Sequence, residues 1–425
     1  MPELYSVHDV FGVSRGIPAN YVRREEVDAV FLDALAQNKH VVVHGSSKQG
    51  KTSLRKQILP DPERILVICR RGWNLGDLHT AILKAAGYVV EGTTTRTTGG
   101  GFKIRAEVKA GIKLPLVGEL GGGGGTDMDH QEGLTVEGRS LELDPADVND
   151  VIAGLQANGA PKFIVLDDFH YLPEDAQQDF AVALKAFHES SDFTFVIVGV
   201  WLDENRLTQF NGDLVGRVIS INVDKWDSEH LARVIHGGGE LLGIVFDERF
   251  SSTLVSQALE SVWIVQETCR LACIADEVFE TQQAERTVTG DVGALVKQVV
   301  DSDSARFNGF LTRFAAGFDE TEMELHKWLL YAVINAESEV LRAGLSYAQV
   351  WQEIADSHPQ GELSVDGLDQ ALRSTAELQI VRLGLSPLIL DYDPTARRLA
   401  VVDRTFLVWL RHQIRDELLD HISIS

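Results

Sequence analysis

One stretch of sequence indicates the fold of this chain, namely Gly45-Ser46-Ser47-Lys48-Gln49-Gly50-Lys51-Thr52. It fits the pattern G-x-x-x-x-G-K-[ST] and follows the apolar run His40-Val41-Val42-Val43-His44, which is typical of a buried strand. A helical segment, residues 53–58, comes directly after it. Two glycines let such a loop curl so that its backbone N–H groups face one point, where the helix dipole adds positive potential. The pattern therefore predicts a strand, a phosphate-binding loop and a helix.

Within this loop the last two residues carry the chemistry. We expect Lys51 to reach the β- and γ-phosphates of a nucleotide and Thr52 to hold Mg²⁺. A tight strand–helix turn without a ligand would not explain this lysine and this hydroxyl. The predicted nucleotide-binding residues are Gly45, Ser46, Ser47, Lys48, Gln49, Gly50, Lys51, Thr52 and Ser53.

A second signal is the apolar run 163–166 followed by Asp167 and Asp168. Carboxylates that leave the carboxyl end of a strand in an α/β sheet lie where such sheets bind ligands. We expect Asp167 to hold Mg²⁺ and Asp168 to orient or deprotonate an attacking water, as a catalytic residue alongside Lys51. The alternative for Asp168 is a helix cap.

The rest of the first half alternates strands and helices. Apolar runs at 65–69, 163–166, 193–198 and 218–221 are separated by helical patterns, one of them at 174–190 and another beginning at Asp144-Pro145. This rhythm indicates an α/β domain with a parallel sheet covered on both faces. After Asp227 we expect no more strands, only three or four helical segments that form a lid over 227–315. The predicted domains are 1–225, 226–316 and 317–425.

Two further regions stand apart. Residues 91–144 hold linker-like stretches at 93–98 and 121–125 and alternating stretches at 102–109 and 134–143, which predict an inserted β-ribbon. It is either a tethered surface hairpin or an arm for association. The last hundred residues show helical patterns at 321–338, 346–355 and 365–376, then a hairpin pattern with strands at 388–391 and 399–402. This order predicts a winged-helix-like domain.

The two motifs resemble those of P-loop NTPases of the AAA+ and STAND class, and more closely those of origin-recognition-like and STAND-type prokaryotic ATPases. The resemblance implies a sheet in the order 5-1-4-3-2. It places Tyr21 and Val22, in the segment 21–25, beside the adenine of ATP. It also implies that Arg217, in 212–217, is an arginine finger for a neighbouring subunit; the alternative is a pair with Asp213 or a lid carboxylate.

The chain departs from this class at several positions. AAA+ motors usually have Glu at the position of Asp168. An aspartate there is more typical of slow switches of the STAND type. Val200-Trp201 follow the strand at 193–199, so no sensor 1 residue is assigned, and Asn205 is the nearest asparagine. Arg270 is close to the expected sensor 2 position, but an ordinary helix-surface role is the simpler interpretation. His358, His412 and His421 are equivalent candidates for a nucleotide-sensing histidine.

Composition excludes some functions. With 39 basic and 63 acidic residues the net charge is −24, which excludes a broadly basic surface that coats nucleic acid. Residues 341–425 hold eight arginines, no lysine and twelve acidic residues, so we favour protein docking over DNA binding for this part; Arg397 and Arg398 alone make no footprint. No apolar run is long enough to cross a membrane, and the three cysteines suit reduced core thiols of a cytoplasmic protein.

These observations favour an ATP-dependent molecular switch with slow hydrolysis, acting on a partner protein or as a homo-oligomer. The resemblance permits a role in prokaryotic defence. The alternatives are a DNA-associated ATPase, such as a replication or transposition loader or regulator, and a scaffold that binds nucleotide without turnover. No guanine-reading segment is found at the expected place, which favours ATP over GTP.

Overall fold

The computed structural model describes residues 4–12, 16–96, 102–108, 140–201, 204–317, 324–359, 363–385 and 387–424. Its central sheet is parallel and has the strand order β2-β6-β7-β1-β8. The strands are β1 (His40–His44), β2 (Arg64–Ile68), β6 (Phe163–Asp167), β7 (Thr194–Val198) and β8 (Val218–Asn222). Counted along the five strands and read from β8, this is the order 5-1-4-3-2. The predicted α/β class and strand order are therefore confirmed.

The chain divides into two compact units. One consists of Asp61–Val196 and Leu207–Arg217, and the other of Met1–Pro60, Ile197–Arg206 and Val218–Ser425. In the first unit the helices are η2 (Asp61–Glu63), α4 (Leu75–Ala85), α5 (Val148–Ala157), η3 (Phe169–Tyr171), α6 (Glu174–Ser190), α7 (Arg206–Phe210, but for its first residue) and η4 (Gly212–Leu214).

The core of the first unit forms between helix α6 and strand β7. Phe180 and Phe187 of the helix meet Phe195 of the strand at ring-centroid distances of 5.3 and 4.7 Å. All three rings are fully buried. Burial of such large apolar surfaces is the main force that holds a helix on a sheet.

Two local predictions for this unit need correction. Helix α5 begins at Val148 rather than near Pro145, because the side chain of Asp147 accepts a hydrogen bond from the N–H of Asn149 and caps it there. A three-stranded antiparallel sheet, β3-β4-β5, includes β3 (Tyr88–Arg96) where linker-like composition was expected. The threonines of that stretch are good strand formers, and pairing with β4 (Phe102–Val108) decides the outcome.

The predicted ribbon agrees with this sheet in part. Strands β4 and β5 (Ser140–Leu143) lie in the two alternating stretches and pair antiparallel, with Ile104 opposite Leu143. Residues 109–139, with the glycine run 121–125, lie outside the described residues.

The second unit holds the predicted loop and most of the remaining helices. They are α1 (Val7–Val10), η1 (Glu25–Ala29), α2 (Val30–Ala36), α3 (Lys51–Ile58), α8 (Ser228–Leu242), α9 (Glu248–Gln257), α10 (Val262–Ala275), α11 (Val292–Asp301), α12 (Ser304–Ala316), α13 (Leu325–Asn335), α14 (Ser338–Ala343), α15 (Tyr347–Ser357), α16 (Val365–Arg373), α17 (Thr375–Glu377), η5 (Leu378–Arg382), α18 (Arg404–Arg411) and α19 (Arg415–His421).

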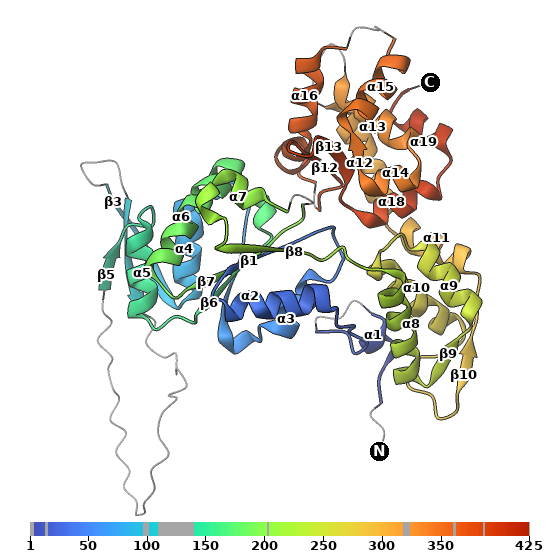
Figure 1. The fold of residues 1–425 in the computed structure, drawn as a ribbon, viewed down its shortest axis with the longest axis horizontal. Helices are drawn as coiled ribbons and strands as arrows, with labels where there is room; N and C mark the ends of the chain where they lie inside the picture. The colour runs from blue at the N-terminus through green and yellow to red at the C-terminus, as the bar shows by residue number, and fades with distance from the viewer. Residues whose placement is uncertain are drawn as a thin grey trace, which may run out of the picture. The chain divides into compact units, whose positions relative to one another are not determined.

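The lid region is helical, as expected, but strands do not stop at Asp227. Strands β9 (Ile244–Phe246) and β10 (Arg286–Val288) pair in parallel beside α8 to α11 (Figure 1). Each has only three residues, which is too short for a periodicity to reveal. Gly243 makes β9 possible, because at φ +64° it ends α8 in the left-handed conformation and turns the chain back.

The C-terminal part combines helices with a small sheet. After α13 and α14 comes β11 (Leu345–Ser346), then α15, α16, α17 and η5, and then the hairpin β12 (Leu390–Asp393) and β13 (Arg398–Val401). The three strands form an antiparallel sheet in the order β11-β13-β12. The predicted hairpin thus begins and ends within two residues of the expected positions.

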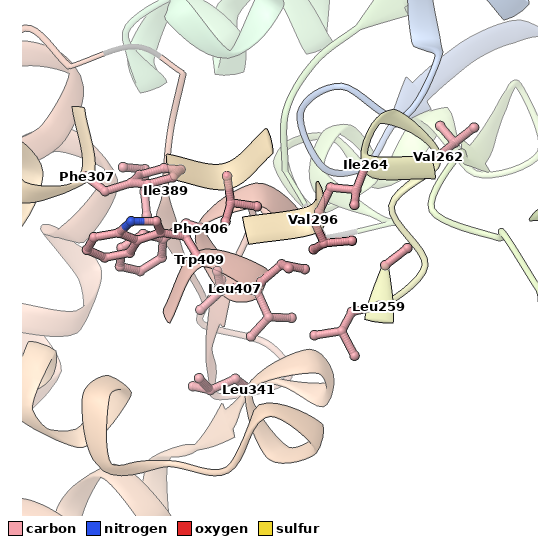
Figure 2. Close-up of a cluster of buried hydrophobic side chains, with 14 of the residues drawn as sticks. Leu259, Val262, Ile264, Val296, Phe307, Leu341, Ile389, Phe406, Leu407 and Trp409 are labelled. Carbon is pink, nitrogen blue, oxygen red and sulfur yellow. The ribbon is translucent and has the colours of Figure 1, made fainter. Parts of the chain in front are cut away.

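One apolar cluster joins the lid helices to the C-terminal part (Figure 2). Phe307 of α12 lies 5.1 Å, between ring centroids, from both Phe406 and Trp409 of α18. Val262 and Val296 of the lid belong to the same buried cluster. Burial of these side chains therefore fixes α18 against the lid.

Two predictions about the whole chain concern cysteines and membranes. Cys69, Cys269 and Cys273 are all buried and unpaired, in agreement with the expected core thiols. Among the helices that the structure describes, none has the length and apolar character needed to span a bilayer.

Candidate functional site

The loop between β1 and α3 has the backbone that its two glycines permit. Gly45 has φ +132° and Gly50 φ +87°, both on the side of φ that L side chains avoid. A Cβ on Gly45 would also lie 2.9 Å from the Asp224 carboxylate and from the Val223 side chain. The first glycine is therefore required twice, by its backbone angle and by the close approach of the segment after β8.

Asp224 holds the start of the loop. Its carboxylate accepts hydrogen bonds from the Ser46 N–H, at 2.8 and 3.0 Å to the two oxygens, and from the Ser46 hydroxyl at 2.7 Å. Lys51, at the start of α3, folds back and donates to the carbonyl oxygens of Gly45 and Ser46. The ammonium group of the predicted phosphate-binding lysine thus lies inside the curl of the loop.

The segment 21–25 packs on the same residues after β8. The Tyr21 hydroxyl donates to Asp28 at 2.7 Å, and burial together with this contact raises the pKa of Tyr21. Arg24 is fully buried, stacks 3.9 Å above the Trp226 ring and donates to the Val223 carbonyl oxygen. Val22 is buried in the same core.

Trp226 in turn supports the loop, because its indole N–H donates to the Gln49 carbonyl oxygen at 3.3 Å. The structure therefore brings the two residues predicted to lie beside adenine into the same unit as the loop. In the same segment, Arg24 contacts Val223 and Trp226, and Trp226 contacts the loop.

Three consecutive loop residues contact the lid and the C-terminal part. The Ser47 N–H donates to the Val402 carbonyl oxygen at 3.3 Å. The Lys48 ammonium lies 2.9 Å from the Asp303 carboxylate and 3.7 Å above the centre of the Trp263 ring. These two residues, predicted to bind nucleotide, are thus held by elements far away in the sequence.

Gln49 is the third of these residues and is fully buried. Its side chain donates to the Glu260 carbonyl oxygen at 3.0 Å and accepts from the Val262 N–H at 3.3 Å. Both partners lie at the start of α10, so the loop and the lid share a buried polar connection.

The two aspartates at the end of β6 take part in short-range contacts. The Asp168 N–H donates to the Asp167 side chain at 3.1 Å, and the Asp167 carbonyl oxygen accepts from the Cys69 N–H at 2.8 Å. Burial, and then the charges of Asp168 and Asp167, raise the pKa of the Cys69 thiol. Both aspartates are partly exposed.

Asp168 has φ +58°, in the left-handed region that aspartate tolerates better than most residues. It precedes η3, yet its side chain makes no capping hydrogen bond to that helix. The helix-cap alternative for Asp168 therefore receives no support. Backbone strain of this kind gathers at functional sites.

Oxygen donors of the predicted metal site are present. Thr52, in the first turn of α3, is exposed, and Asp167 carries a carboxylate at the end of β6. A hydroxyl and a carboxylate are hard donors, the kind that Mg²⁺ takes together with phosphate oxygens. Each residue, taken within its own unit, thus offers the type of oxygen donor that Mg²⁺ accepts.

Arg217 pairs within its own unit. Its guanidinium lies 2.8 Å from the Glu189 carboxylate and also donates to the Asp213 carbonyl oxygen. Asp213 itself pairs with Lys185 at 2.6 Å. The expected contact with Asp213 is therefore present, but through its carbonyl oxygen, while the carboxylate that pairs with Arg217 is that of Glu189 rather than one from the lid.

The other sensor candidates have structural partners. Arg270 forms a 2.7 Å ion pair with Glu267, one turn away on α10, as expected of a helix-surface residue. His358 is buried and packs 4.8 Å from Trp328, between ring centroids. His412 is half-buried, and its pKa is lowered by burial and then by Lys297.

The two arginines of the hairpin are engaged by the chain. Arg397 stacks 4.1 Å above the Tyr347 ring, and Arg398 donates to the Gly344 carbonyl oxygen at 2.8 Å. A DNA phosphate would have to compete with these contacts.

Sequence reasoning missed four residues that shape the loop: Asp224, Trp226, Glu260 and Asp303. A signal existed for the first one only. Asp224 follows an apolar strand, as Asp167 does, and parallel strands present their carboxyl ends at one edge of a sheet. The other three lie in loops or at helix starts, where no pattern marks a distant contact.

Comparisons with known proteins bear on the fold. A comparison with protein-family models gives no match, and neither does one with curated protein sequences. Among solved structures, a Walker-type ATPase of Pyrococcus abyssi superposes with a TM-score of 0.56 at 12% identity, over 95% of this chain and 99% of that chain. The chain has the fold of a P-loop ATPase.

More distant likenesses are to the Orc1 protein of Aeropyrum pernix, solved in complex with DNA, and to Thermotoga maritima RuvB. The first has a TM-score of 0.43 at 12% identity over 98% of this chain and 97% of that one. The second has 0.36 at 12% identity over 89% and 92%.

Proposed function

We propose that this chain is an ATP-binding, slowly hydrolysing switch that controls a partner protein or an assembly of its own copies. One observation carries the proposal. The loop 45–52 has the phosphate-binding backbone, and three of its residues, Ser47, Lys48 and Gln49, contact the lid or the C-terminal part. A ligand that alters the loop therefore acts on contacts that fix other parts of the molecule.

Binding would begin at the loop. The backbone N–H groups around Gly50 and the N-terminus of α3 favour a negatively charged phosphate. Lys51 would exchange the carbonyl oxygens of Gly45 and Ser46 for β- and γ-phosphate oxygens, a charge-assisted contact. Ser46, held by Asp224, would keep the curl of the loop while the lysine moves.

Hydrolysis is assigned to the residues after β6. When bound, Mg²⁺ would neutralise phosphate charge, and the Thr52 hydroxyl and Asp167 carboxylate would hold it. The Asp168 carboxylate would orient the attacking water and accept its proton. Aspartate is one methylene shorter than glutamate, which is why we expect turnover to be slow.

The proposal of a switch is supported by the lid and the C-terminal part. Interactions that a γ-phosphate makes with the loop can shift a two-state equilibrium only if the states bind ATP differently. A winged-helix-like C-terminal part that docks on proteins rather than on DNA suits this proposal, since Arg397 and Arg398 are engaged within the chain. Arg217 is proposed as the group that would act between subunits.

The test is the ATP hydrolysis rate per subunit over a series of protein concentrations, with and without duplex DNA. A slow rate that climbs with concentration supports a switch completed between subunits. A slow rate that stays flat supports a switch that waits for a partner protein. Stimulation by DNA alone would favour the loader alternative, and a chain that binds ATP without any turnover would favour the scaffold.

A further inference from the structure

Residues Val402, Asp403 and Arg404 run alongside the loop in matching order. Val402 reaches Ser47 directly through its carbonyl oxygen. Asp403 is fully buried and caps α18, accepting from the N–H groups of Thr405 and Phe406. Side-chain contacts also connect Asp403 to Lys48, through Asp303 and Arg306, and Arg404 to Gln49, through Glu260.

A chain of charges joins Lys48 to Asp403. The Lys48 ammonium lies 2.9 Å from Asp303, whose carboxylate lies 3.5 Å from the Arg306 guanidinium. Arg306 is 2.6 Å from Asp403. Asp303 and Arg306 are three residues apart at the start of α12, so one helix end bridges the loop and the cap of α18.

A second connection runs through the turn before α10. The Glu260 carboxylate lies 2.8 Å from Arg342 and 4.0 Å from Arg404, while its carbonyl oxygen holds Gln49. Leu259 and Glu260 are consecutive non-glycine residues with φ of +46° and +64°. Two such residues in a row need support from their surroundings, and the loop and α18 supply it.

The apolar cluster of Figure 2 involves the same two helices, α12 and α18. Phe406 and Trp409 of α18 pack on Phe307 of α12, and the Trp409 indole N–H donates to Ser304 at 2.8 Å. The same helix therefore carries Asp303 and Arg306 at its start and the apolar seat of α18 along its length.

We propose that Asp303 competes with nucleotide phosphate for Lys48, so that ATP binding and the attachment of residues 402–404 to the loop oppose each other. The proposal rests on the proposed function, since it needs ATP at this loop. Asp303 acts here as a positioning residue and Lys48 as a second phosphate-binding lysine beside Lys51.

The direction of the coupling between ATP binding and the attachment of residues 402–404 follows from the charges involved. A triphosphate on the loop attracts the Lys48 ammonium and repels the Asp303 carboxylate, which breaks their 2.9 Å contact. The triphosphate also competes for the N–H groups of the loop. One of these, the Ser47 N–H, donates to the Val402 carbonyl oxygen. By linkage, the attachment of residues 402–404 weakens ATP binding by the same factor as ATP weakens the attachment.

The experiment measures ATP affinity and the amide hydrogen exchange of residues 404–411 in the full chain. In the wild type, saturating ATP is expected to speed exchange in α18. In Asp303→Asn, we expect ATP to bind about fivefold more tightly, at the low end of common coupling factors, with fast exchange even without ATP. Protection of α18 by ATP would overturn the proposal.

Two further variants separate this mechanism from a general charge effect. Asp301→Asn removes one carboxylate two residues away, in an exposed pair with Lys297, and should change neither measurement. In a Lys48→Met chain, Asp303→Asn should leave ATP affinity unchanged within about twofold, because the competition needs both residues and their effects are then not additive. An equal gain with and without Lys48 would refute the competition.

The outcomes also distinguish this inference from the proposed function. Absence of ATP binding by the wild-type chain would refute both. ATP binding that needs Lys51 but ignores Asp303→Asn, with α18 exchange unchanged, would refute the inference alone.

Discussion

The loops after β1 and β6 differ in the contacts and the chemistry that they offer. The loop 45–50 is held from afar, by Asp224, Glu260, Asp303 and Val402. At the end of β6, Asp167 and Asp168 bond to each other, and the contact from Cys69 comes from the neighbouring strand. A loop fixed by many distant parts is suited to report its occupancy to them, whereas carboxylates at the carboxyl end of a strand are suited to a chemical step. The two loops should therefore respond differently to mutation.

The largest effect is expected for Lys51→Ala. Loss of a charged contact to phosphate removes roughly 3 kcal/mol of binding free energy, about 100-fold in ATP affinity. Isothermal titration calorimetry would measure it. Lys56→Ala, on the same helix, is the control and should bind ATP like the wild type. Tight binding by Lys51→Ala would show that the loop is not the phosphate site.

Asp168→Asn should separate chemistry from binding. A positioned base contributes typically 10²–10⁴-fold, so we expect hydrolysis to slow by about 100-fold while ATP affinity stays within about twofold. Single-turnover phosphate release measures the rate. Asp179→Asn, on the exposed face of α6, serves as the control. If Asp168→Asn weakened binding as much as it slowed turnover, the contrast between the two loops would be lost.

Asp224→Ala tests support from a distance. It leaves the buried Ser46 N–H and hydroxyl without their acceptor, which costs about 1–3 kcal/mol. We expect ATP affinity to fall by about tenfold and the melting temperature to drop by a few degrees. Thermal unfolding and titration of the same sample give both values. A stable protein with unchanged affinity would mean that the loop holds its curl unaided.

The sequence predicted the buried strands and both motifs because these signals are local, whereas the sheet order came from the resemblance to AAA+ and STAND ATPases. Buried parallel strands are continuous apolar runs, and the loop from Gly45 to Thr52 carries its chemistry in eight consecutive residues. The lid strands β9 and β10 were missed because three residues show no period. Contacts such as Ser47 with Val402, or Lys48 with Asp303, join residues hundreds of positions apart and leave no trace in the pattern around either one.

The smallest effect is expected for Arg217→Ala in a dilute sample. The guanidinium lies 2.8 Å from Glu189, and both side chains are partly exposed, at 31% and 48%. Such pairs contribute about 0–1 kcal/mol, so the free energy of unfolding should change by less than about 1 kcal/mol. The hydrolysis rate of an isolated subunit should not change, because a finger acts on the site of a neighbour.

Concentration then decides between the finger and the structural pair. If the rate per subunit of the wild type climbs as subunits assemble, Arg217→Ala should stay at the dilute rate, and Lys185→Ala, which breaks the adjacent pair with Asp213, should climb normally. An equal loss of rate in dilute and concentrated Arg217→Ala would instead show that Arg217 acts within its own subunit. In that case the carboxylates at the end of β6 would depend on Arg217 of the same subunit.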